Sequence, residues 1–425
     1  MGVVVRSRAE WHHGGVRQTP GGPKRLSLGG APLPAAALAG ATPERRLLVA
    51  CLAPSPVDPA DLAPLTTEPL DWAVFLALAR RNRVMPTVDT TLRPLAKAGA
   101  LPDWFVGELR KDKARNLANG QLLALGVVRV SQLLADAGVR ALVFKGPVLA
   151  LGLYGSVGAR QFNDLDLLVD PTDARPVRDT LVAAGFELRE DFEWTQSYSE
   201  PDSRLHLDLH QRLFPPEFRC DLTFERAWAQ HVELEIEGGR VPTFGTAHRF
   251  IGASLQVAKD GWEQRLLMQK VLDVAAASRS ATAAEFSTIA DEAGRTRFTG
   301  IVSNAIESAR SIGLGPTVDN IDQRLLPTQR GRSYADAAMA RLWNEDIDYP
   351  KPVVMAQRHR LLREHAIDGV RPFAARVFAA PTEIDEARFK LPAPLRPLYR
   401  VLRPLRMVTG HAVRTVRHKW ANRRS

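Results

Sequence analysis

The stretch that decides the fold is NDLDLLV, residues 163–169. Its alternating and then continuous apolar residues predict a β-strand over residues 164–170, in which residues i and i+2 point to the same face. We therefore expect Asp164 and Asp166 to project side by side, while Leu165 and Leu167 face the core. Two carboxylates directed at one point repel each other unless a cation lies between them. The motif predicts a site for a hard, oxygen-preferring cation such as Mg²⁺.

A further carboxylate is predicted on a neighbouring strand. Residues 205–210, LHLDLH, alternate apolar and polar side chains, as a half-buried strand does. The polar face of this strand carries His206, Asp208 and His210. We take Asp208 as the third metal ligand, since two-metal sites for phosphoryl chemistry need several carboxylates. His210 is interpreted as orienting Asp208 or the acceptor molecule of a transfer reaction at the metal site. His206 is interpreted as structural. Zinc is disfavoured because no cysteine or clear fourth ligand accompanies the histidines.

An anion-binding element is predicted just before this motif. Residues 141–145, ALVFK, form a short apolar strand, and Gly146-Pro147 begins a helix that ends near residues 154–155. The N-terminus of a helix offers free N–H groups and a positive dipole to a phosphate. Gly146 would let the phosphates come close, because it has no side chain. The alternative is a simple tight turn.

Two cations flank the predicted site. Lys145 ends the first strand and is interpreted as a phosphate contact, the alternative being a solvated strand end. Arg160 lies four residues before Asp164 in the sequence. Its guanidinium is suited to a triphosphate, and the alternative is a core ion pair with Asp164 or Asp166.

The order of these motifs resembles the uncharacterised bacterial nucleotidyltransferase family of the polymerase-β superfamily. The matching elements are, in chain order, Lys145-Gly146, Arg160, the pair Asp164 and Asp166, Asp208, and His210. The resemblance covers residues 45–410, and it includes a Trp-containing helix over residues 262–273 and a late Pro381-Thr382-x-x-Asp385. Asn163 stands where the superfamily commonly has Ser, and Pro147 stands where it has a second small residue.

The resemblance implies transfer of an NMP from an NTP to an acceptor, with release of pyrophosphate and dependence on Mg²⁺ (or Mn²⁺). It implies catalytic and metal-binding roles for Asp164, Asp166 and Asp208. The acceptor stays open among a protein, a sugar phosphate, a small molecule and RNA. Two readings from other classes also stay open. One is a catalytically inactive binding protein that keeps the fold, and the other is a membrane- or RNA-associated accessory factor.

The net charge of +10 lies at the two ends of the chain. Residues 391–425 contain nine Arg and Lys and no acid, and residues 1–46 have a net charge of +5, so residues 47–390 carry −4. A body that grips a nucleic-acid duplex is therefore disfavoured. The basic tail, residues 391–425, either contacts a membrane or RNA or docks on the body. Two cysteines cannot form a disulfide framework, which favours the cytoplasm.

The pattern along the chain predicts an α+β protein in which a small mixed-sheet core lies between two helical subdomains. The predicted divisions are 1–45, a disordered or mis-annotated start; 46–137, a helical N-terminal subdomain; 138–245, the nucleotidyltransferase core; 246–390, a helical C-terminal subdomain; and 391–425, the basic tail. We expect a helix over 104–137 with Leu117, Leu122, Leu125, Val128 and Leu133 inward, one helix over 255–278, and a hairpin turning at Gly238-Gly239.

Overall fold

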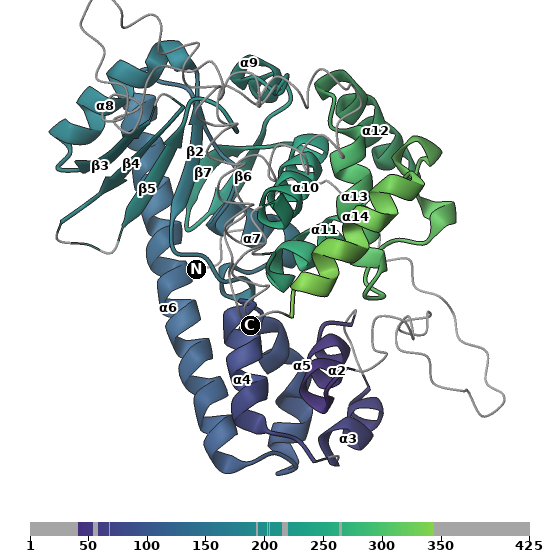
Figure 1. Ribbon diagram of the computed structural model, residues 1–425. Coiled ribbons are helices and arrows are strands. Elements are labelled where there is room, and N and C mark those ends of the chain that lie inside the picture. The colour runs from purple at the N-terminus through teal and green to yellow at the C-terminus, as the bar shows by residue number, and fades with distance from the viewer. Residues whose placement is uncertain are drawn as a thin grey trace, which may run out of the picture.

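The computed structural model describes residues 41–53, 58–67, 69–192, 194–201, 203, 205–214, 220–262 and 266–343. The predicted start over residues 1–40, the Pro381-Thr382-x-x-Asp385 segment and the basic tail lie outside the described residues. The chain is an α+β protein (Figure 1): a mixed sheet has helices on both faces, and helices from the two halves of the chain meet below and beside it.

The helices that precede the sheet begin at recognisable signals. They are α2 (Pro43–Cys51), α3 (Pro59–Thr67), α4 (Trp72–Arg81), α5 (Met85–Lys97) and α6 (Asp103–Asp136). The Asp71 side chain caps α4 by accepting hydrogen bonds from the backbone N–H groups of Ala73 and Val74. The inward face of α4 carries Phe75 and Ala79, which are fully buried.

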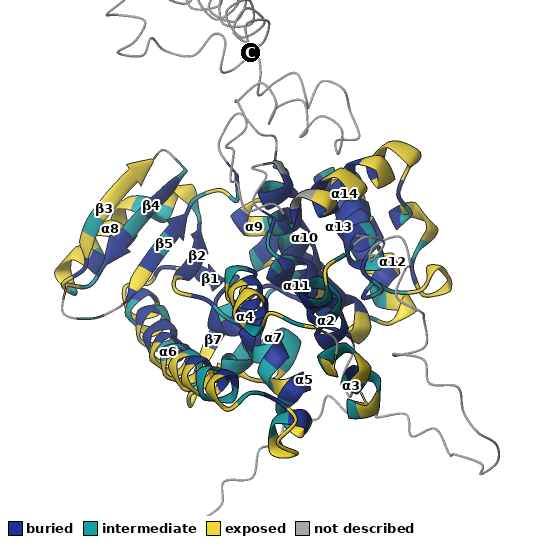
Figure 2. Cartoon of the chain, turned by 60° about the horizontal axis from the view of Figure 1, so that its bottom comes forward, coloured by how far each residue is buried: buried dark blue, intermediate teal, exposed yellow. Residues whose placement is uncertain are grey.

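Helix α6 forms where it is expected, and Val128 and Leu133 pack against the core as predicted, but the inward positions predicted for three leucines are wrong. Leu117, Leu122 and Leu125 are 42%, 41% and 56% exposed. The buried stripe is instead Leu123, Val127, Val130 and Leu134. The small residues of α6 explain the choice. A Cβ on Gly126 would lie 2.6 Å from Leu205 Cδ1, so only the glycine-bearing face can approach the sheet this closely. Figure 2 shows the exposed outer face of α6.

By length and composition alone, α6 could cross a membrane. In this fold it is a shared core helix. Its first half contributes Phe105 and Leu109 to the core formed mainly by the helices that precede and follow the sheet. Its second half contributes Leu123 and Val130 to the core beneath the sheet. One rigid helix thus connects the two cores.

The sheet has seven strands in the order β3-β4-β5-β2-β1-β7-β6. The strands are β1 (Ala141–Val143), β2 (Leu165–Val169), β3 (Glu187–Phe192), β4 (Thr195–Ser199), β5 (His206–His210), β6 (Val232–Ile236) and β7 (Gly239–Thr243). The β2–β5 and β1–β7 pairs are parallel, and the other neighbours are antiparallel. The β6–β7 hairpin turns one residue earlier than predicted, at Glu237-Gly238, where both residues have positive φ.

The two faces of the sheet are chemically different. Leu165, Leu167 and Leu207 pack against α6 and α8 (Ala174–Ala183) in one apolar core. On the opposite face the same strands carry Asp166 and Asp208. The connecting elements are α7 (Pro147–Tyr154), η2 (Val157–Ala159), η3 (Pro171–Asp173), α8 (Ala174–Ala183) and α9 (Phe224–Trp228). The period of two along a strand therefore puts the polar residues together on the face away from α6.

Helices dominate after the sheet, as predicted. They are α10 (Thr246–Trp262), α11 (Met268–Ser280), α12 (Ala283–Thr296), α13 (Thr299–Arg310), η4 (Val318–Asn320), η5 (Gln323–Leu325) and α14 (Gln329–Arg341). The single helix predicted over 255–278 is wrong, because α10 and α11 are separate helices. One apolar core joins Leu47 and Phe105 from the first helices to Phe250 and Phe286 from the last. The predicted subdomain boundaries stay a prediction.

Candidate metal and nucleotide site

The centre of the site is a carboxylate pair on two parallel strands. Asp166 on β2 and Asp208 on β5 are direct register partners. Their side chains point to the same face because both belong to the same pleat. One ligand atom from each, together with a ring nitrogen of His210, lies within 4.8 Å of the others. Backbone pairing alone thus brings together two carboxylates that are far apart in the sequence.

His210 supports this pair differently from the sequence expectation. Its Nε2 lies 3.0 Å from Asp166 Oδ1, so the hydrogen-bond partner is Asp166 and not Asp208. The imidazole ring packs edge-on against Phe144, with 5.2 Å between the ring centroids. His210 Nδ1 is buried and has no hydrogen-bond partner among the described residues. The ring is therefore held by packing and by its contact with Asp166, while Nδ1 has no hydrogen-bond partner among the described residues.

Asp208 is oriented from a strand that the sequence analysis missed. Ser197 on β4 is the register partner of Asp208, and its Oγ donates a 2.6 Å hydrogen bond to Asp208 Oδ1. The row Ser197, Asp208 and Asp166 runs straight across three adjacent strands. The stretch TQSYS has few apolar residues, which is why it gave no strand signal. Ser197 leaves the second oxygen of Asp208 available to a ligand.

Lys145 contacts the carboxylate cluster directly. Its Nζ donates a 2.7 Å hydrogen bond to Asp166 Oδ1, the same oxygen that His210 contacts. The ammonium also lies 4.8 Å from the centroid of the Phe144 ring. Burial opposes ionisation of Asp166, but Lys145 and then His210 outweigh it and hold the pKa of Asp166 well below its usual range. Asp166 is therefore an ionised, buried carboxylate.

Asp164 lies beside this cluster and is not a member of it. It immediately precedes β2, and its side chain is exposed. Partial loss of hydration and the charge of Asp166 raise the pKa of Asp164. The structure thus brings together Asp166, Asp208 and His210, with Asp164 at the rim. The metal-ligand role of Asp164 stays a prediction.

The glycine at the start of α7 is required by the backbone. Gly146 has φ +63° and ψ −132°, a region that residues with a side chain rarely adopt. A Cβ at this position would lie 3.0 Å from the carbonyl oxygen of Asp164. Gly146 therefore allows the turn into α7 to pack against the backbone that leads into β2. No side chain caps the N-terminus of α7. Its first N–H groups remain a predicted phosphate contact.

Arg160 is committed to a partner that sequence reasoning did not identify. Its guanidinium makes a bidentate ion pair with Asp273 on α11, with Nη2–Oδ2 2.9 Å and Nε–Oδ1 3.0 Å. Both side chains are at most 4% exposed. Tyr154 Oη donates a 2.9 Å hydrogen bond to Asp273 Oδ1. The core ion pair foreseen for Arg160 exists, but with Asp273. The triphosphate contact for Arg160 stays a prediction.

Comparison with known proteins assigns the family. The model of a family described as uncharacterised nucleotidyltransferase matches residues 68–312. The chain belongs to this uncharacterised nucleotidyltransferase family. No curated protein matches it. Among solved structures it is similar to an antigenic nucleotidyltransferase-like protein from Paracoccidioides brasiliensis, at 17% identity and a TM-score of 0.28, over 38% of this chain and 77% of that one.

The residues of the cluster fit a divalent cation. Ionised Asp166 and the second oxygen of Asp208 offer the hard oxygen ligands that Mg²⁺ and Mn²⁺ prefer. A ring nitrogen of His210 lies within 4.8 Å of the two carboxylate oxygens and completes the cluster in the described part of the chain. Lys145 is the one group that opposes this fit among the described contacts of Asp166, because its ammonium already neutralises Oδ1. A cation at Asp166 would bind in competition with Lys145.

Proposed function

We propose that the protein is a metal-dependent nucleotidyltransferase that moves an NMP from an NTP to an acceptor oxygen and releases pyrophosphate. The single observation that carries the proposal is the convergence of Asp166, Asp208 and His210 on one face of the sheet, beside the uncapped start of α7. Mg²⁺ or Mn²⁺ at such a cluster would activate the acceptor oxygen and neutralise charge on the triphosphate.

The roles of the protein groups follow from their positions. Asp166 and Asp208 would hold the metal, with Ser197 fixing the Asp208 carboxylate and His210 fixing that of Asp166. The first N–H groups of α7 would face the phosphates. Positioning and electrostatics would supply most of the rate enhancement, as is usual in phosphoryl transfer.

The bond changes are those of an in-line displacement. The acceptor oxygen forms a bond to the α-phosphorus, and the bond from that phosphorus to the oxygen bridging to the β-phosphate breaks. Pyrophosphate leaves with the electron pair. Asp208 is the candidate to assist removal of the proton from the acceptor. The acceptor is a hydroxyl or a phosphate oxygen.

A transfer assay tests the proposal. Purified protein is incubated with α-labelled NTPs, Mg²⁺ or Mn²⁺, and cell extract as the source of acceptor. Label is expected in a product with the wild type, and it is expected to fall by a factor of roughly a hundred or more with Asp166→Asn. Asp170→Asn is the control, because Asp170 follows the same strand but only caps Thr172. Equal labelling by wild type and Asp166→Asn rejects the proposal.

One contact favours a second candidate. Lys145 Nζ neutralises Asp166 at 2.7 Å, which is what a catalytically inactive nucleotide-binding protein of this fold would show. Such a protein would bind an NTP without a metal and transfer nothing. Nucleotide binding that is unchanged by chelation of all divalent cations, with no labelled product, selects this candidate.

A further inference from the structure

A lysine on α11, Lys270, lies among the charged groups around the site. Lys145 and Arg160 are two described cations whose charges act on Lys270. Asp166 pairs with Lys145, and Asp273 pairs with Arg160. Within the described residues, Lys270 Nζ takes part in no hydrogen bond and no ion pair, although Lys270 is half-buried. The half-buried ammonium has lost part of its hydration without a direct ion-pair partner, although the charges of Asp260 and Asp273 act on it. An anionic ligand would compensate for that loss.

Lys270 lies within electrostatic range of the metal-binding strand. Its positive charge acts on Asp164, and the charges of Arg160 and Lys145 act on Lys270. Burial and these neighbouring cations lower the pKa of Lys270 to about 8, against the opposing influence of Asp260 and Asp273. Lys270 therefore belongs to the same charged region as Lys145 and the start of β2.

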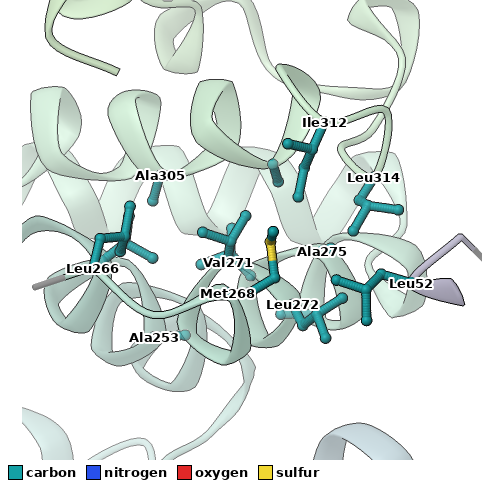
Figure 3. Packing of buried hydrophobic residues seen from close by; sticks show 14 of the residues in the cluster. Leu52, Ala253, Leu266, Met268, Val271, Leu272, Ala275, Ala305, Ile312 and Leu314 are labelled. Atoms are coloured by element: carbon teal, nitrogen blue, oxygen red, sulfur yellow. The ribbon is translucent and has the colours of Figure 1, made fainter. Parts of the chain in front are cut away.

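Helix α11 holds Lys270 in a fixed place. Its apolar side chains, including Met268, Val271 and Leu272, are buried among the surrounding helices (Figure 3). Gln269 Nε2 donates a 2.9 Å hydrogen bond to the carbonyl of Gln161. Three residues after Lys270, Asp273 pairs with Arg160. Lys270 thus lies between Gln269 and Asp273, and both of these residues contact the segment that leads directly into Asp164.

The helix end itself is not available as a ligand site. The backbone N–H groups of Met268 and Gln269 already donate to Asn82. The anion must therefore be bound by the Lys270 side chain, assisted by the field of the neighbouring cations. This cationic region lies beside the carboxylate cluster. The anionic group at Lys270 is therefore expected to belong to the same molecule that binds at the cluster.

We propose that Lys270 binds the β- and γ-phosphates of the NTP and then the departing pyrophosphate. This inference rests on the proposed function, because it places the leaving group of that reaction. Lys145 lies at the carboxylate cluster and Lys270 lies on α11, so the triphosphate would extend from β2 toward α11. A phosphate carried by the acceptor is the other source of the same chemistry.

Equilibrium binding of inorganic ligands tests the inference without catalysis. The probes are tripolyphosphate, pyrophosphate and orthophosphate in the presence of Mn²⁺, measured by calorimetry. Lys270→Met is expected to weaken tripolyphosphate and pyrophosphate by about tenfold, the loss of one charge-assisted hydrogen bond. Lys270→Arg is expected to restore binding to within about threefold. Lys259→Met, a half-buried lysine on α10, is the matched control and should bind as the wild type does.

The outcomes separate the inference from the function on which it rests. If Lys270→Met weakens only orthophosphate, the lysine serves an acceptor phosphate and the inference is overturned. Unchanged polyphosphate binding by a folded Lys270→Met also overturns it, while the transfer reaction stands. A wild type that binds neither Mn²⁺ nor polyphosphate defeats both. If Lys270→Met also lowers the unfolding midpoint, Lys270→Arg decides: restored polyphosphate binding and stability support the inference, and restored stability without restored binding overturns it.

Discussion

Asp166 and Asp208 are register partners on adjacent parallel strands, so the hydrogen-bond ladder between β2 and β5 sets the separation of their carboxylates. A site built on paired strands is more rigid than one built on loops. The same register extends to Ser197 on β4, which places a hydroxyl against Asp208. Small changes along this row should therefore alter metal binding without altering the fold.

Ser197→Ala should weaken metal-dependent activity by about tenfold, because groups that orient a ligand carboxylate typically contribute this much. The Ser197 hydroxyl is lost from Asp208 Oδ1, and the carboxylate is then free to rotate. Ser199→Ala is the control, since Ser199 lies two residues further along the same face and bonds Arg189. The activity titrated against Mn²⁺ concentration measures the effect. A loss of equal size in both variants would assign it to strand β4 as a whole.

Lys145→Met should tighten Mn²⁺ binding by about tenfold, because it removes the ammonium that competes for Asp166 Oδ1. Lys145→Arg keeps the charge and should bind Mn²⁺ as the wild type does. Direct titration with Mn²⁺, without nucleotide, is the measurement. Weaker Mn²⁺ binding by Lys145→Met would mean that Lys145 organises the site and does not compete for it.

Gly146→Ala should destabilise the protein by about 1–3 kcal/mol, because alanine is strained at φ +63° and its Cβ meets the Asp164 carbonyl. Gly294→Ala is the matched control. Gly294 lies inside α12 with nothing within 4 Å of an added Cβ, so alanine should be neutral or stabilise by about 0.5–1 kcal/mol. Urea unfolding of both variants provides the comparison. Equal stabilities would show that the turn relaxes without cost.

Arg160→Met should destabilise the protein by about 3–5 kcal/mol, the cost of leaving the buried Asp273 carboxylate without its counter-charge. Arg175→Met is the exposed control, because Arg175 is 91% exposed and its partner is 3.9 Å away. Its effect should stay within about 0.5 kcal/mol. Unfolding free energies from denaturant titration decide the point. If Arg160→Met is as stable as the control, the Arg160–Asp273 pair does not stabilise the fold, and a role for Arg160 in binding phosphate is favoured instead.

Local sequence patterns predicted the strands and turns around the site because those signals are short-range. The NDLDLLV stretch predicts β2, the LHLDLH stretch predicts β5, and Gly146-Pro147 predicts the start of α7. The family resemblance is confirmed by the match over residues 68–312. These features depend on alternation and on backbone chemistry that neighbouring residues determine.

Features that depend on tertiary contacts could not be predicted. The inward face of α6 is set by close approach of Gly126 to Leu205, two residues far apart in the chain. Strand β4 has little apolar signal and is stabilised by its neighbours β3 and β5. The Arg160 partner lies on α11, more than a hundred residues later. The hydrogen bond from His210 to Asp166 follows from the β2–β5 register, which no single strand reveals.

The central claim is that Asp166 and Asp208 hold a divalent cation. Mn²⁺ titration followed by electron paramagnetic resonance measures this directly, on the full chain and without nucleotide. We predict saturable binding by the wild type and by Asp170→Asn, and binding weakened by at least about tenfold in Asp166→Asn and in Asp208→Asn. Mn²⁺ bound with the same affinity by all four proteins would contradict the account.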